Sequence, residues 1–146
     1  MSKAFDILLV EDSVEDAFLT RTIIEDGNVP IDLSVTRNGA DALAFLRRKA
    51  PFADAPPPDL ILLDVNLPKK NGFEVLAEMR ADETLRAIPV IMFTTSEAPQ
   101  DIHSSYALGA NCYITKPARL ADFTATVRAI ENFWLKAVRL PSPLSK

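Results

Sequence analysis

Five short apolar segments recur along the chain, and stretches in which apolar residues repeat at helical spacing separate them. Short apolar runs of this kind are typical of strands, and longer amphipathic runs are typical of helices. A regular alternation of strand and helix predicts a parallel sheet with helices on both faces. The segments expected to form strands are 5–10, 31–35, 60–63, 90–93 and 112–114.

The second of these segments differs from the others because its apolar residues, Ile31, Leu33 and Val35, alternate with polar ones. Such alternation indicates a half-exposed strand at an edge of the sheet. An edge position for the second strand suits the strand order 2-1-3-4-5. The sequence therefore predicts an α/β fold, a flavodoxin-like doubly wound five-stranded parallel sheet with five helices.

In the first and in the last predicted helix, apolar residues recur along one face. The first begins at Ser13, whose hydroxyl can cap it, and ends at Gly27. The last has apolar residues at alternating spacings of three and four. The residues expected to face the core are Val14, Ala17, Phe18 and Ile24 in the first helix, and Leu120, Phe123, Val127, Ile130 and Trp134 in the last.

Composition limits the function classes. The 146 residues suit one domain, and their net charge of −4 disfavours binding to nucleic acid. The single cysteine, Cys112, excludes an intrachain disulfide, and no apolar run approaches the roughly 18 residues of a membrane span. The glycines match no phosphate-binding loop, and His103 has no companion at metal-ligand spacing. We expect a cytoplasmic protein with no direct contact to nucleic acid or membrane.

Polar residues follow four of the predicted strands. Glu11 with Asp12, Asp64 and Thr94 come directly after their strands, and Lys116 comes after Thr115. The carboxyl ends of parallel strands lie at one edge of the sheet, where sites of doubly wound folds collect. Taken alone, each residue has a structural explanation, as a loop charge, a cap or a surface lysine. The joint arrangement favours a site.

The chemistry of these groups indicates a divalent cation and a phosphoryl group. Clustered carboxylates raise one another's pKa unless a cation neutralises them. Oxygen ligands at a partly open site suit Mg²⁺. Lys116 and Thr94 can contact phosphoryl oxygens, and Asp64, which emerges from an apolar strand, is a candidate nucleophile.

With these motifs in place, the sequence resembles the receiver domain of bacterial two-component response regulators. The resemblance covers about residues 5–135. Its matching stretches are 7–13, 60–68 with Gly72, 89–94 and 109–117.

The resemblance implies a role for each site residue. Asp64 would be the phosphoacceptor, which receives a phosphoryl group from a histidine kinase. Thr94 would be the switch hydroxyl, Tyr113 the switch aromatic and Lys116 the phosphoryl contact, followed by a cis bond to Pro117. The metal ligands, for Mg²⁺ or a substituting Mn²⁺, would be Glu11, Asp12, Asp64 and the backbone carbonyl of Asn66.

Two positions depart from the family pattern. Glu11 stands where aspartate is usual, which should preserve metal binding. Thr95 stands where many receivers have alanine or glycine, which leaves the rate of dephosphorylation open. The receiver domain is expected to span 1–138 and a short tail 139–146, in a stand-alone regulator similar to those that pair with bacterial phytochrome kinases.

Three functions remain to be separated: a phosphorylated switch that catalyses its own phosphorylation and dephosphorylation, a metal-dependent phosphatase, and a degenerate receiver. The phosphatase is disfavoured because Asn66 stands where such an enzyme would need a second carboxylate. The degenerate receiver is disfavoured because Asp64, Thr94 and Lys116 are intact.

Apolar residues near the end of the chain further predict a homodimer through the fourth and fifth helices, the fifth strand and the tail. The alternative is that the tail folds back on its own domain. The apolar residues concerned are Phe133, Leu135, Val138 and Leu140.

Overall fold

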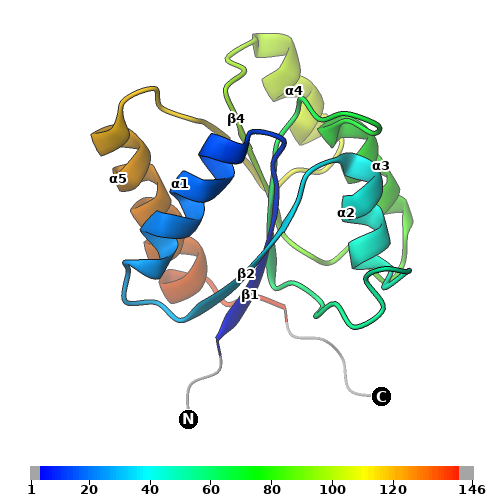
Figure 1. Ribbon diagram of the computed structural model, residues 1–146. Helices are drawn as coiled ribbons and strands as arrows, with labels where there is room; N and C mark the ends of the chain where they lie inside the picture. The colour runs from blue at the N-terminus through cyan, green and yellow to red at the C-terminus, as the bar shows by residue number, and fades with distance from the viewer. Residues whose placement is uncertain (1–3, 142–146) are drawn as a thin grey trace.

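A computed structural model describes residues 4–141, which form a five-stranded, fully parallel sheet with helices on both faces (Figure 1). The strand order is β2-β1-β3-β4-β5, which confirms the predicted flavodoxin-like topology and the edge position of β2. The strands are β1 (Phe5–Val10), β2 (Ile31–Thr36), β3 (Leu60–Leu63), β4 (Val90–Thr94) and β5 (Cys112–Thr115).

Helices α1 and α5 lie on one face of the sheet and α2 and α3 on the other, while α4 packs beside β5 (Figure 1). Within the described residues, no helix is long and apolar enough to cross a membrane. The helices are α1 (Val14–Glu25), α2 (Gly39–Leu46), α3 (Gly72–Ala81), α4 (Pro99–Ala107), α5 (Leu120–Ile130) and a π-helical segment η1 (Glu131–Ala137).

The central strands divide the core into two layers. Successive side chains of a strand point to opposite faces, so Leu8 and Ile61 pack toward α2 and α3, whereas Leu9 and Leu62 pack toward α1 and α5. All of β3 and β4 is buried. The rigid centre therefore holds the carboxyl ends of β1, β3 and β4 in fixed positions.

Side-chain caps mark the start of helices α1, α2 and α3, which follow strands β1, β2 and β3. The Ser13 hydroxyl accepts from the Asp16 amide, and the Asn38 side chain accepts from the Asp41 amide. Asn71 and Glu74 form a reciprocal capping box at α3. These caps fix where each helix begins relative to the strand before it.

The predicted apolar face of α1 is wrong at two positions. Val14 and Phe18 are 60% and 69% exposed, and the buried residues are Thr20, Ile23 and Ile24. The apolar pattern does not predict burial of Thr20, because threonine is polar. Its hydroxyl donates to the Asp16 carbonyl, so the buried polar group has a hydrogen-bond partner. The helix ends at Glu25, and Asp26 caps it directly before Gly27, the residue predicted to terminate the helix.

The last helix departs from its predicted pattern at both ends. Leu120, in the first turn, is 64% exposed. After Ile130 the winding widens into η1, where the Val138 amide donates to the Phe133 carbonyl, five residues back. This wider turn buries Leu135 and leaves Phe133 exposed.

Gly72 has no room for a side chain, which gives a test of how tightly α3 packs beneath the strand ends. A Cβ at Gly72 would lie 2.2 Å from the backbone oxygen of Asp64. We expect Gly72→Ala to lower the free energy of unfolding by about 1–3 kcal/mol, because the backbone must move. Urea denaturation measures this loss.

Gly27→Ala is the matched control for that substitution. Its Cβ would meet the end of the Arg128 side chain, which can swing away. The expected change is about 0.5 kcal/mol or less. Equal losses in the two variants would contradict the assigned backbone contact at Gly72.

Candidate functional site

A buried ammonium group joins the ends of three strands. Lys116 follows β5, and its Nζ donates to Glu11, at the end of β1, and lies 3.2 Å from Asp64 Oδ2, at the end of β3. It also lies 3.0 Å from Oδ2 of Asp16, in the first turn of α1. The ammonium thus uses its three donors on three carboxylates.

Backbone hydrogen bonds that continue the sheet set the positions of these residues. The Glu11 amide donates to the Thr36 carbonyl, and the Asp64 amide donates to the Val10 carbonyl. The Lys116 amide donates to the Thr94 carbonyl at 2.7 Å. The site therefore has the rigidity of the sheet although its residues lie just beyond the strands.

Burial and neighbouring charges act in opposite directions on the pKa values of Glu11 and Lys116. Burial raises the pKa of Glu11 to about 7, even though the hydrogen bond from Lys116 opposes the rise. Burial alone would lower the pKa of Lys116, but its hydrogen bond to Glu11 and the charges of Asp64 and Glu11 raise it above the ordinary value. The ammonium is therefore firmly charged.

Asp64 is oriented by groups on both of its carboxylate oxygens. Oδ1 accepts from the Asn66 amide at 3.3 Å, and Oδ2 accepts from Lys116. Its side chain is 11% exposed, and the next residue, Val65, is buried. The carboxylate is held at the surface end of a buried strand, where a reacting group can approach it.

The predicted metal ligands are partly brought together. Glu11 and Asp64 share the Lys116 ammonium, whereas Asp12 and Asn66 are exposed beside them. Across residues 4–141, no group of three histidine, cysteine or acidic side chains is arranged to hold a metal ion. The carboxylate and carbonyl oxygens still have the chemistry that Mg²⁺ prefers, and the ammonium already marks a place where positive charge is favoured.

The two predicted switch residues lie on β4 and β5. Thr94 is fully buried, and its hydroxyl accepts weakly from the Ser96 amide at 3.4 Å. Tyr113 is half-buried, and its hydroxyl donates to the Ser96 carbonyl at 2.9 Å. Both side chains therefore converge on the loop between β4 and α4.

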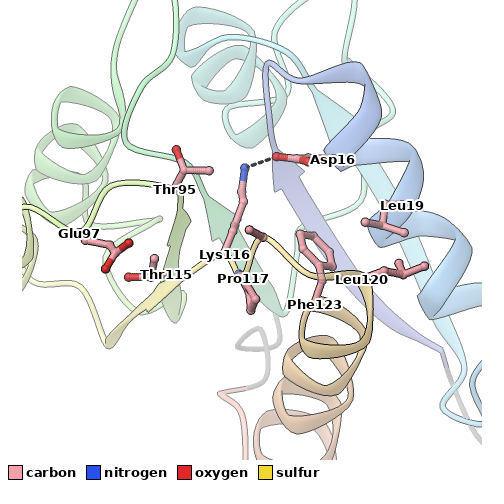
Figure 2. A pocket seen from close by; sticks show the side chains of 10 residues that line it. Asp16, Leu19, Thr95, Glu97, Thr115, Lys116, Pro117, Leu120 and Phe123 are labelled. Atoms are coloured by element: carbon pink, nitrogen blue, oxygen red, sulfur yellow. Dashed lines mark hydrogen bonds and ion pairs between the residues drawn. The ribbon is translucent and has the colours of Figure 1, made fainter.

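A cavity of about 550 Å³ opens beside Lys116, between α1, α5 and the loops that follow β4 and β5 (Figure 2). Exposed Thr95 lies on its wall together with Asp16. Figure 2 shows the side chains of Lys116 and Asp16 pointing toward each other. Asp16 therefore faces both the ammonium and the cavity.

Two features of the site differ from the sequence prediction. Asp16 was not among the predicted site residues because it lies within a helix rather than at the end of a strand. Its position on the first turn, five residues after Glu11, is the signal that could have indicated it.

The cis bond predicted between Lys116 and Pro117 is wrong, because the cis peptide within residues 4–141 is Ala50–Pro51. The Lys116–Pro117 bond takes the trans form that most X–Pro bonds adopt.

Comparison with known proteins identifies the family. The profile of the response regulator receiver domain matches residues 7–128. The chain belongs to this family. Receiver domains act as signalling switches and bind Mg²⁺. The family prediction made from the residues at the strand ends is thereby confirmed.

The relatives include regulators associated with phytochromes. Response regulator Rcp1 of Synechocystis sp. is 45% identical over 136 residues, which are 93% of this chain and 92% of Rcp1. The crystal structure of the phosphorylated cyanobacterial phytochrome response regulator RcpA is 46% identical, with a TM-score of 0.92 over 96% of this chain and all of RcpA. The Mn²⁺-bound form of Rcp1 is 44% identical, with a TM-score of 0.90 over 94% of this chain and 99% of that one. The predicted likeness to phytochrome-associated regulators is confirmed.

Removal of the central ammonium tests its electrostatic role. We expect Lys116→Met to lower the free energy of unfolding by about 3–5 kcal/mol near pH 8, because two buried carboxylates lose their partner. Lys70→Met is the control, since Lys70 pairs with Glu78 at the surface and should contribute about 0–1 kcal/mol. Urea denaturation without divalent cations measures both.

The same variant should show a defined dependence on pH. A carboxyl group whose pKa is raised in the folded state adds stability below its unfolded value, and this stability is lost as the pH rises through the folded value. Since burial already raises the pKa of Glu11 to about 7, the penalty of Lys116→Met should be smaller at pH 5 than at pH 8. If the loss of unfolding free energy caused by Lys116→Met does not change with pH, the raised pKa assigned to Glu11 is contradicted.

Proposed function

We propose that Asp64 accepts a phosphoryl group from a histidine kinase and that the modified receiver then binds its partners differently. The observation that carries this proposal is the position of Asp64 at the end of buried β3, with the Lys116 ammonium 3.2 Å away. In the transfer, the P–N bond of a phosphohistidine breaks and a P–O bond to the Asp64 carboxylate forms. Hydrolysis of that acyl phosphate resets the switch.

The surrounding residues each have a role in this step. Lys116 offers positive charge to the oxygens of the incoming phosphoryl group. Glu11, Asp12, Asp64 and the carbonyl of Asn66 are the proposed ligands of Mg²⁺, for which Mn²⁺ can substitute. When bound, the divalent cation offsets the negative charges of the carboxylates and the phosphoryl oxygens.

The switch is proposed to run through Thr94 and Tyr113. A phosphoryl group on Asp64 would draw the Thr94 hydroxyl inward, and Tyr113 would change its contact with Ser96. A pre-existing equilibrium between two conformations would shift as a result. The proposed receiver domain spans 1–138. Of the tail 139–146, residues 142–146 lie outside the described residues.

The kinase partner is proposed to be a bacterial phytochrome. The support is the likeness to RcpA, described as a cyanobacterial phytochrome response regulator, and to the bacteriophytochrome response regulator AtBRR, which is 36% identical. Direct binding to nucleic acid is not part of the proposed function, in keeping with the net charge of −4.

Phosphorylation by a small-molecule donor tests the acceptor residue. Acetyl phosphate should modify the wild-type protein only when Mg²⁺ or Mn²⁺ is present, and Asp64→Asn should abolish the modification. Asp12→Ala should weaken Mg²⁺ binding, measured by calorimetry. Intact-mass spectrometry and acyl-phosphate gels measure the modification itself.

Asp54→Asn is the matched control, because Asp54 is exposed in the loop before β3. It should retain phosphorylation at the wild-type level. Modification of Asp64→Asn at that level would refute the assignment. Turnover of an added phosphoester would instead support the phosphatase.

A homodimer through α4, β5, α5 and the tail is proposed as the assembly. Its support is exposed apolar surface on these elements, at Tyr106, Leu120 and Phe133. The expected contribution of this end of the chain is reduced: Leu135 in η1 is buried, and Leu140 in the tail packs against the core layer beneath α1 and α5. Phe133, 57% exposed, is therefore the best apolar candidate among the residues that follow α5.

Sedimentation tests this assembly. We expect the wild-type protein to form a dimer at about 50 µM and Phe133→Asp to be monomeric, because the charge would be buried without a partner. Phe18→Asp, which changes another exposed phenylalanine, on α1, is the control and should remain dimeric. A monomeric wild-type protein, phosphorylated or not, would exclude the dimer.

A further inference from the structure

Among the described residues, Asp16 is the one carboxylate bonded to the Lys116 ammonium that lies outside the predicted set of metal ligands. Its Oδ2 lies 3.0 Å from Nζ, closer than Asp64 Oδ2 at 3.2 Å. The Lys116 side chain is 3% exposed and the Asp16 side chain 30% exposed, at the wall of the cavity (Figure 2). The ammonium is therefore held between the acceptor side of the site and a carboxylate on α1.

The backbone of Asp16 is fixed on both sides. Its amide donates to the Ser13 hydroxyl that caps α1, and its carbonyl accepts from the Thr20 hydroxyl at 2.8 Å. Thr20 is buried against the sheet. Asp16 is thus a stable anchor that need not move when other carboxylates change partners.

The ammonium and a divalent cation compete for the same oxygens. Both Glu11 and Asp64 bond to Lys116 in this structure, and both belong to the proposed Mg²⁺ site. When these two carboxylates turn to a metal ion, the buried ammonium loses two of its three hydrogen-bond partners. A buried, charged amine without partners is costly, so metal binding depends on what still holds it.

We propose that Asp16 is a positioning residue, which retains the Lys116 ammonium when Glu11 and Asp64 bind a divalent cation. The inference rests on the proposed function, because it concerns the same site. Asp16 lowers the cost of metal binding by keeping one strong hydrogen bond on Lys116. It also keeps the ammonium beside Asp64, where a phosphoryl group would arrive.

Calorimetric titration of the full chain with MgCl₂ tests the inference. Asp16→Asn should weaken Mg²⁺ binding by about tenfold, since a charge-assisted hydrogen bond is lost. Glu15→Gln removes the same charge from the same helical turn at an exposed position, and should change affinity by less than about twofold. Equal effects of the two substitutions would overturn the inference.

A double-mutant cycle separates positioning from simple attraction between Asp16 and the metal ion. In a Lys116→Met background, Asp16→Asn should no longer weaken Mg²⁺ binding, because the group that Asp16 holds is gone. A tenfold effect that persists in this background would mean that Asp16 acts through its own charge, which overturns the inference.

Side-chain NMR gives a readout that does not depend on folding of the Lys116→Met variant. In Mg²⁺-saturated wild-type protein, the Lys116 ammonium protons should remain protected from exchange with water, and in Asp16→Asn this protection should be lost. Unchanged protection in the variant would overturn the inference alone. If the wild-type protein fails to bind Mg²⁺ or to become phosphorylated, the proposed function itself fails, which is a distinct result.

Discussion

The Lys116 ammonium is the interaction on which the site depends. Elements distant in sequence meet at this group, because Glu11, Asp16 and Asp64 all bond to it. A buried charge is tolerated only where partners surround it, and removal of one partner leaves the others uncompensated. The carboxyl edge of the sheet is therefore held together by charge as well as by the apolar core beneath it.

The rigid sheet and the charged edge have complementary roles. Strands β3 and β4 are buried along their whole length, so the strand ends cannot easily separate. The polar groups at those ends carry opposing charges that can exchange partners without disturbing the layers below. A fold of this kind suits a switch, because the change in charge is local while the sheet provides a fixed frame.

Residue patterns are sufficient to predict the topology, and they also indicate three of the residues that meet at the carboxyl edge of the sheet, Glu11, Asp64 and Lys116. Buried strand segments must be apolar, so the first polar residue after each one marks the edge of the sheet, as at Glu11 after β1 and Asp64 after β3. The same reasoning failed within helices. Asp16 contributes from a helical turn, and Phe18 is apolar yet exposed, and neither position is distinguished by periodicity alone.

The proposed path from Asp64 to the proposed switch residues, Thr94 and Tyr113, follows from the same geometry. Lys116 is bonded through its amide to the Thr94 carbonyl, and Tyr113 precedes it by three residues on β5. In the proposed function, a phosphoryl group on Asp64 would add negative charge beside the ammonium and would act first on Lys116. Because β5 lies at the edge of the sheet, it has a neighbouring strand on one side only, β4. The edge strand can therefore adjust to such a change more easily than buried β3, so the proposed response is expected at β5 and α4 rather than beneath Asp64.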